Sequence, residues 1–320
     1  MARILASIDL GGTNTACALA SADGAMLVER TIPTLPNQCP DAILGRIVAT
    51  LEAMAEEIGE RPDAVGMGAP GLVDRAKGTT LFLPNLATQW RGVAVAQFLN
   101  GRLECPVYLL NDVRIATLGE MTFGLTCKTG TMVFVAIGTG IGGGIVVDGR
   151  LRLGPLGAAG ELGHQTILPD GPLCGCGNHG CLEALASGPA ITAEGVRMLL
   201  TGMAPRLYEM TDGRIEEVNP KSMAAAAAAG DEAIREAIVR AASYLGIGVA
   251  NMVNALHPNL VVLGGGVAAT GALLIDTVRT TVCCRVRMFP VDDVSIENSV
   301  LGDKAGLFGG IALAMRNGEI

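Results

Sequence analysis

Two segments of this sequence repeat the same succession of strands and turns, and this duplication restricts the folds open to the chain. The first, ILASIDLGGTNTACALASADGAMLVERTI, predicts three strands joined by turns at Gly11-Gly12-Thr13 and Asp23-Gly24. The second, TMVFVAIGTGIGGGIVVDGRLRLG, predicts strands over 132–137, 144–147 and 150–153, joined by turns at Gly138-Thr139-Gly140 and Asp148-Gly149. A chain that forms the same meander twice is expected to be internally duplicated.

Helices and strands alternate between and after the two meanders. Apolar runs predict strands over 64–70, 107–112 and 260–266, and helical patterns cover 41–58, 113–124, 222–243, 244–256 and 303–316. The helix over 222–243 includes six consecutive alanines, which indicate helix propensity more than function. This alternation predicts an α/β fold.

Composition favours small-molecule chemistry over other functions. The formal net charge is −8 and only 17% of the 320 residues are charged, without a long Lys/Arg run, so we expect neither a nucleic-acid nor a membrane partner. The apolar stretch 241–275 is broken by His257-Pro258 and by glycines, which argues against a membrane span. Nine cysteines, an odd number, and the absence of a signal-like N-terminus predict a reducing, cytoplasmic location.

The two glycine turns are candidate phosphate sites. Gly138, Gly140 and Gly143 satisfy G-x-G-x-x-G, but a dinucleotide fingerprint requires a helix directly afterwards, and here the pattern continues as strand. We therefore reject a nicotinamide enzyme of that type. Glycines let backbone amides approach a phosphate, so two matched turns could hold one polyphosphate. For a single turn, a purely structural role remains the alternative.

Two aspartates stand where ligands bind to open sheets. Asp9 comes two residues before the first glycine turn, where a Mg²⁺ ion would offset its burial, although a turn-stabilising role is open. Asp112 follows the apolar strand VYLL and is a candidate base for phosphoryl transfer to an alcohol. A helix N-cap is the structural alternative for Asp112, and the two roles are compatible.

A cluster of cysteines predicts a metal site. Cys174, Cys176 and Cys181 lie within eight positions, and His164 could complete a tetrahedral zinc site without an open position. Such a metal would be structural, and it would fix a loop flanked by Glu161 and Glu183. His179 is an alternative fourth ligand, and free or oxidisable thiols are the alternative to zinc.

Seven motifs together resemble the ROK family of bacterial sugar kinases. They occur in that family's order from residue 4 to about 315, and the Glu-x-Gly-His and C-x-C-G-x-x-G-C-x-E pair is the most specific part. The motifs are IDLGGT, GAPGLVD, LLNDVRIATLGE, GTGIGGGIVVDGRL, GAAGELGH, CGCGNHGCLEALASG and NLVVLGGGV.

The resemblance implies two ribonuclease-H-like, actin-like ATPase domains with an interdomain cleft. We expect a smaller lobe over 1–115 and 301–320 and a larger lobe over 116–300 that carries the zinc-binding loop. ATP and Mg²⁺ would face Asp9, Gly11, Gly12, Thr13, Thr139 and Gly140, and adenosine would face Gly265 and Gly266. Pro189 stands where the family often has Thr, so no nucleotide contact is assigned there.

The resemblance also implies roles for the polar residues and the class of substrate. Asp112 would be the catalytic base, and the sugar hydroxyls would be held by Asn111, Asp112, Glu161, His164 and Glu183. His164 would use one nitrogen for a structural zinc, with Cys174, Cys176 and Cys181, and the other for the sugar. A homodimer or homotetramer is expected.

Glucose is the expected sugar because the sequence is most similar to the family's glucose-phosphorylating members. Kinases for N-acetylmannosamine, fructose, mannose or allose share the motifs, and a non-catalytic sugar sensor and a polyphosphate donor stay open. Asn85 is a possible sugar contact or a loop-capping residue. Repressors of the family carry a helix-turn-helix before the first strand, and none is expected because the first glycine turn begins at residue 11.

Overall fold

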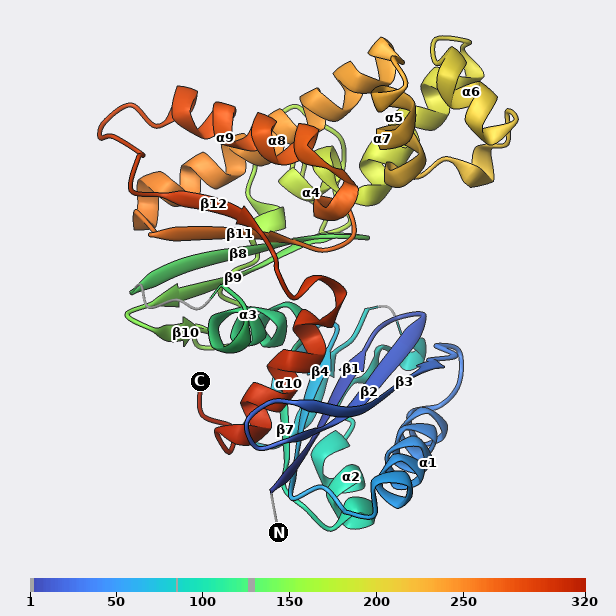
Figure 1. Ribbon diagram of the computed structural model, residues 1–320, viewed down its shortest axis with the longest axis vertical. Helices are drawn as coiled ribbons and strands as arrows, with labels where there is room; N and C mark the ends of the chain where they lie inside the picture. Colours follow the sequence, from blue (N-terminus) through green and yellow to red (C-terminus); the bar gives the residue numbers. More distant parts are fainter. Residues whose placement is uncertain (1–2, 85, 126–129) are drawn as a thin grey trace. The chain divides into compact units, whose positions relative to one another are not determined.

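The computed structural model describes residues 3–84, 86–125 and 130–320 (Figure 1). Their contacts divide the chain into two compact units. The first comprises Met1–Lys128, Arg150–Ala159 and Asp303–Ile320, and the second comprises Thr129–Gly149 and Gly160–Gly302. The lobe boundary expected at residue 115 falls inside helix α3 (Asp112–Phe123), which lies whole in the first unit.

The first unit is built on a five-stranded sheet with the order β3-β2-β1-β4-β7. The predicted meander forms its antiparallel half, and β4 and β7 extend the sheet in parallel from β1. The strands are β1 (Ile4–Leu10), β2 (Asn14–Ser21), β3 (Met26–Pro33), β4 (Ala64–Ala69) and β7 (Val107–Asn111). Parallel strands end at the same edge, so β1, β4 and β7 bring Asp9 and Asn111 to one end of the sheet.

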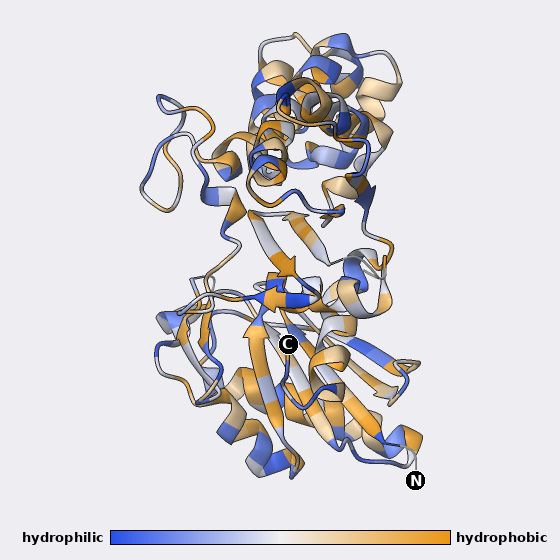
Figure 2. Ribbon diagram, turned by 90° about the vertical axis from the view of Figure 1, so that its left-hand side faces the viewer, coloured by the Kyte–Doolittle hydropathy of each residue, from blue (hydrophilic) through white to orange (hydrophobic). Residues whose placement is uncertain are grey.

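Helices of this unit bury their apolar sides against the sheet. Helix α1 (Pro40–Ile58) begins with a proline, which suits the first helical turn, and ends at Gly59 in the left-handed region. Helix α10 (Ala305–Met315) packs against β1, β4 and α3. In Figure 2, which is coloured by hydropathy, strands are mostly orange or pale, whereas helices carry both hydrophobic (orange) and hydrophilic (blue) residues. The remaining elements are β5 (Leu72–Asp74), β6 (Thr79–Phe82), η1 (Ala87–Trp90) and α2 (Val95–Leu103).

The second unit repeats the topology of the first. Its sheet has the order β10-β9-β8-β11-β12, so a meander is again extended by two parallel strands. The strands of this second sheet are β8 (Thr131–Ile137), β9 (Ile141–Val147), β10 (Arg150–Arg152), β11 (Leu260–Gly264) and β12 (Ser295–Asn298). By its contacts, β10 is grouped with the first unit, and the other four strands are grouped with the second. The predicted duplication is confirmed, and β9 follows the glycines directly, as the rejection of a dinucleotide fingerprint requires.

Helices contribute much of the core of the second unit. Helix α8 (Glu232–Leu256) and α9 (Ala272–Arg285) pack together, and their apolar residues join those of β8 and β11 in one buried cluster. The other elements are η2 (Leu162–His164), α4 (Leu182–Ala186), α5 (Gly188–Leu200), α6 (Pro205–Thr211), η3 (Ile215–Glu217), α7 (Pro220–Ala228) and η4 (Ala268–Thr270), with η5 (Gly302–Lys304) at the boundary.

The predicted helix boundary near residue 243 is wrong. The chain instead breaks between α7 and α8, where Gly230 has a φ of +92° and the Asp231 side chain caps the amide of Ile234. The sequence pattern did not predict this break, because the residues on both sides of Gly230 favour a helix and the alanine run suggests that one helix continues. The cap at Asp231 depends on local geometry, which the pattern does not give. None of the described helices is both long and apolar enough to cross a membrane.

Candidate functional site

Asp9 and Asp112 lie on either side of Gly68 at the carboxyl end of the first sheet. A Cβ placed on Gly68 would lie 3.6 Å from Asp9 Oδ1 and 3.5 Å from the Cα of Asp112. Burial, and then the charge of Asp112, raise the pKa of Asp9 to about 6. Because the charge of Asp112 acts on the buried carboxylate of Asp9, a bound cation or a proton is favoured there, and these are the partners needed in phosphoryl transfer.

A glycine of helix α10 makes room for the Asp9 carboxylate. A Cβ on Gly306 would overlap Asp9 Oδ2, so any larger residue there would displace the carboxylate. Sequence reasoning missed both Gly68 and Gly306. The glycines of AGLFGG, unusual inside a helix, were the available signal, because helical glycine costs about 1 kcal/mol and needs a packing reason.

Asn111, and not Asp112, caps helix α3. Its Oδ1 accepts hydrogen bonds from the amides of Val113 and Arg114, at 3.0 and 3.2 Å, and its Nδ2 donates to Gly71 O at 3.0 Å. Asp112 is the first residue of the helix, and its Oδ1 accepts from the amide of Val113 at 2.8 Å. Because the oxygen of Asn111 already has these donors, Asn111 can offer a ligand only an N–H group.

Arg114 is a buried residue of this site that sequence reasoning did not identify. Its side chain is 2% exposed, and it donates to the carbonyls of Ala158 and Ala159 at 3.2 and 3.1 Å. It also donates to Asn111 Oδ1 at 3.1 Å. The guanidinium therefore fixes the amide of Asn111 and the beginning of the motif GAAGELGH. A charged residue within the apolar pattern VRIATLG was the available signal.

The first glycine turn is tied to the chain that follows β3. Gly11 N donates to Asn14 O at 3.0 Å, and Thr34 donates through its amide to Thr13 O and through its hydroxyl to Gly11 O, both at 2.8 Å. Thr13 is exposed, and Gly12 is partly exposed. The turn therefore presents its backbone to solvent, as a phosphate site requires.

The second glycine turn has a similar internal bond and different supports. Gly138 N donates to Gly140 O at 2.9 Å, and Gly138 O accepts from Gly188 N at 2.8 Å. The amide of Ile141 donates to Glu183 Oε2 at 2.8 Å. Thr139 is exposed at the tip of this turn.

Gly265 and Gly266 follow β11 in the same unit. Gly265 has a φ of +84°, and a Cβ there would meet the backbone of Ile137, whereas Gly266 is open. Pro189 lies in the first turn of α5, a position that proline favours because no helical N–H is lost.

Four residues form one cluster in the second unit with the geometry of a tetrahedral metal site. The donor atoms of His164, Cys174, Cys176 and Cys181 all lie within 4.8 Å of one another. Cys174 Sγ is 3.7 Å from His164 Nδ1, and Cys176 Sγ is 3.7 Å from Cys181 Sγ. Ligand atoms about 3.5–3.8 Å apart are what tetrahedral zinc requires at its usual bond lengths. The residues therefore fit zinc.

Histidine 179 does not belong to this cluster. His179 is exposed, and its Nδ1 is 3.1 Å from Gly171 O. His164 instead turns Nδ1 toward Cys174 and leaves Nε2 at 3.9 Å from Glu161 Oε2. The alternative fourth ligand is therefore ruled out by its position, and the second nitrogen of His164 is available beside Glu161.

The pKa values of two thiols in the cluster are shifted in opposite directions. Burial raises the pKa of Cys181, whereas a hydrogen bond from the backbone of Asn178 lowers that of Cys176. A bound cation would favour the thiolate at each position. Outside the cluster, Cys17 and Cys105 are buried, and Cys127 lies outside the described residues.

Asn85, the possible sugar contact, also lies outside the described residues.

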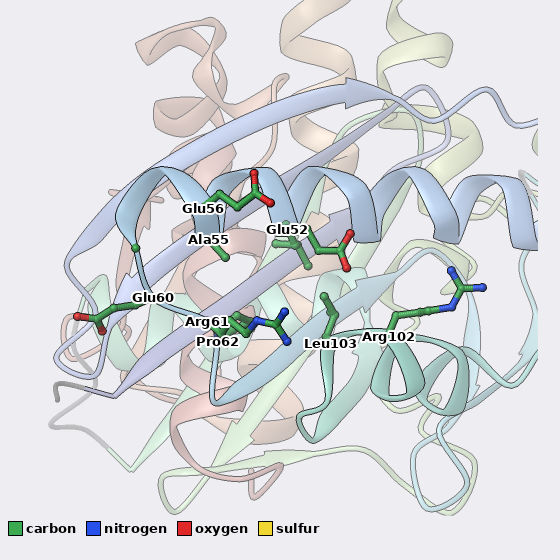
Figure 3. Close-up of a pocket in the computed structure, with 10 residues that line it drawn as sticks. Glu52, Ala55, Glu56, Glu60, Arg61, Pro62, Arg102 and Leu103 are labelled. Atoms are coloured by element: carbon green, nitrogen blue, oxygen red, sulfur yellow. The ribbon is translucent and has the colours of Figure 1, made fainter.

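A separate groove of about 470 Å³ lies between α1 and α2 (Figure 3). Glu52, Glu56, Arg61 and Arg102 line it, and no predicted site residue does. Its lining of exposed, mixed charges is typical of a solvated surface, so the chemistry is assigned to the aspartates and the glycine turns.

Comparisons with known proteins show which family the chain is part of. The ROK family pattern matches residues 5–317. A glucokinase from Streptomyces coelicolor is 33% identical over 312 residues, which are 96% of each protein. A xylose repressor from Caldicellulosiruptor bescii is 32% identical over 90% of this chain and 66% of the repressor. A crystal structure of a ROK family glucokinase from Streptomyces griseus with glucose and AMPPNP has a TM-score of 0.85, at 32% identity over 98% of this chain and 99% of that one.

The fold is thus that of the actin-like ATPases, with two related α/β domains. The chain belongs to the ROK family, whose sugar kinases are among the proteins it is similar to. One similar protein is a repressor, so membership of the family does not by itself make this chain an enzyme. A catalytic role is therefore inferred from the residues of its own site.

Proposed function

We propose that the protein transfers the terminal phosphoryl group of ATP to a hydroxyl of a hexose, forming glucose 6-phosphate from glucose. The observation that carries this proposal is the pair of aspartates beside Gly68, Asp9 near the end of β1 and Asp112 at the start of α3. A kinase needs one acidic group near the metal-bound phosphates and another near the acceptor hydroxyl. A sensor would need neither group for chemistry.

In this proposal Asp112 removes the proton of the attacking hydroxyl, and that oxygen forms the new bond to phosphorus as ADP leaves. Asn111 donates an N–H to the sugar, and Glu161, His164 and Glu183 bind further hydroxyls. The backbone of the turns at 11–13 and 138–140 holds the phosphates, and Gly265 and Gly266 border the adenosine. Mg²⁺, held near Asp9, would supply charge neutralisation at the phosphates.

Three supporting features come from the geometry. Asp9 has the raised pKa of a carboxylate that lacks a counter-charge. Cap contacts fix the start of α3, so the backbone of Asp112 is held rigidly. His164 Nε2 lies on the Glu161 side of the ring, away from the thiols. Zinc in the cluster would be structural, because four protein ligands leave no open position.

Three further properties are part of the proposal: a cytoplasmic location, a homodimer or homotetramer, and glucose as the preferred sugar. N-acetylmannosamine, fructose, mannose and allose are the competing substrates, and polyphosphate is the competing donor.

The test is a panel of sugars assayed with ATP or polyphosphate, scored by kcat/KM. Asp112→Asn should lower kcat by about a thousandfold, since general base catalysis contributes 10²- to 10⁴-fold, while sugar binding changes little. Sugar binding without phosphorylation in the wild type would instead favour the sensor. A kcat for Asp112→Asn close to that of the wild type would reject Asp112 as the base.

A further inference from the structure

Glu183 connects the cysteine–histidine cluster to the second glycine turn. Its Oε2 accepts the amide hydrogen of Ile141 at 2.8 Å, and its Oε1 is 3.9 Å from Cys174 Sγ. A Cβ on Gly140 would overlap Oε2, so the carboxylate lies directly against the turn. All these residues belong to the second unit.

One short segment holds this turn at both ends. The segment 181–188 begins with a ligand of the cluster, Cys181, and continues through α4 to the start of α5. Glu183 fixes the amide of Ile141 after the turn, and Gly188 N donates to Gly138 O before it, at 2.8 Å. A Cβ on Gly188 would lie 2.9 Å from Gly138 O, so this approach depends on glycine.

The cluster fixes the beginning of the same segment. Cys181 is buried and precedes the first residue of α4, and Leu182 N donates to Gln165 O at 3.0 Å, next to His164. Helix α4 has only five residues and cannot hold its own position by propensity. The position of Glu183 therefore depends on the ligands around it.

We propose that the metal cluster positions the donor-phosphate turn through Glu183. Glu183 acts as a positioning residue for Gly138-Thr139-Gly140, in addition to any contact with sugar. Metal binding orders 181–188, the carboxylate then holds Ile141, and the turn keeps its amides directed at the phosphates. The inference rests on the proposed function in one respect, that this turn binds the donor.

The first experiment measures binding of AMP-PNP with Mg²⁺ in the absence of sugar, by calorimetry on the full-length protein. Glu183→Ala should raise the Kd about tenfold, the effect of losing one hydrogen bond to a charged group. Glu183→Gln, which keeps an acceptor oxygen, should restore most of the affinity. Glu161→Ala is the matched control, since it removes the other carboxylate near the cluster and should weaken sugar binding only.

The second experiment measures hydrogen–deuterium exchange in peptides that cover Gly138–Ile141, before and after removal of zinc by a chelator. Exchange should rise on removal and return on re-addition of zinc. In Glu183→Ala, exchange should already be high and should change little with zinc. This readout needs neither sugar nor nucleotide, and it reports on the turn even if a variant is less stable.

Two results would overturn the inference. One is an equal affinity for AMP-PNP in Glu183→Ala and Glu161→Ala. The other is a rate of exchange at 138–141 that is the same with and without zinc in the wild type. A wild-type protein that binds no AMP-PNP would reject the proposed function, and the exchange experiment would still decide whether the cluster controls the turn.

Discussion

The two sheets have the same topology, and their central strands, β1 and β8, differ in the residue that stands just before the strand end. Asp9 pairs with Gly68 of β4, and the corresponding position on β8, paired with Gly264 of β11, is Ala136. Both residues are sixth in a seven-residue strand. The duplicated backbone therefore supplies two equivalent strand ends, and only the first carries an acid.

The supports of the two glycine turns differ in a related way. The first turn is held by Thr34, which belongs to the chain directly after its own meander. The second is held by 181–188, which follows the metal cluster. In the function proposed above, the acidic groups Asp9 and Asp112 belong to the first unit, and the second unit contributes a glycine turn whose position we propose depends on the cluster. Each prediction below changes one side of this contrast.

The largest effect is expected from the cluster. Cys174→Ser should reduce bound zinc from about one per chain to a small fraction, and it should destabilise the second unit by several kcal/mol, because structural zinc contributes directly to folding. Metal analysis and peptide-resolved exchange measure both. Cys283→Ser, at an exposed cysteine outside the cluster, is the control. Equal zinc contents in the two variants would contradict the assignment.

The next largest effect is expected from Asp9→Ala, which gives the end of β1 the residue that β8 has at the corresponding position, Ala136. Asp9→Ala should lower kcat/KM by about a hundredfold or more, as charge stabilisation at the phosphates is lost. The loss should be measured over a range of Mg²⁺ concentrations, and added Mg²⁺ should not restore activity. Asp23→Ala, in the exposed turn of the same meander, is the control. Activity that survives in Asp9→Ala would remove the functional difference between the halves.

Asp9 should also make stability depend on pH. Its folded pKa of about 6 exceeds the unfolded value of 3.8, so the folded protein holds this proton more tightly. The free energy of unfolding should therefore fall by up to about 3 kcal/mol as pH rises from 4 to 6, and then level off. In Asp9→Asn this fall should disappear, as measured by urea unfolding in Mg²⁺-free buffer.

Asp23→Asn serves as a contrast for the pH experiment. The Ser21 hydroxyl lowers the pKa of Asp23, so its substitution should not remove the fall between pH 4 and 6. A stability difference between wild type and Asp9→Asn that is constant over this pH range would show that Asp9 is not buried as described.

The smallest effect concerns the glycine beside Asp9. Gly306→Ala should cost about 1–3 kcal/mol and reduce activity, because the new methyl group displaces the carboxylate. Gly45→Ala, on α1 with nothing within 4 Å of the added atom, should stabilise the protein by about 0.5–1 kcal/mol. Urea unfolding of both variants checks the prediction, and similar changes in both would contradict it.

The sequence by itself determined the features that depend on local pattern. Alternating apolar residues and glycine or aspartate turns specify a meander within some thirty residues. The metal cluster could be predicted because Cys174, Cys176 and Cys181 are close together in the sequence. Asp112 could be predicted as a site residue because it comes directly after an apolar strand. The break at Gly230 was missed because alanine propensity on both sides outweighed it in a local pattern.

Tertiary structure decided which of the candidates meet. It selected His164 over His179, gave the helix cap to Asn111, and brought Gly306 against Asp9 from the other end of the chain. It also directed Glu183 to the amide of Ile141. Such contacts join segments far apart in sequence, and they follow from how helices pack on the sheets. Local periodicity fixes which face a side chain occupies, whereas only packing determines what that face touches.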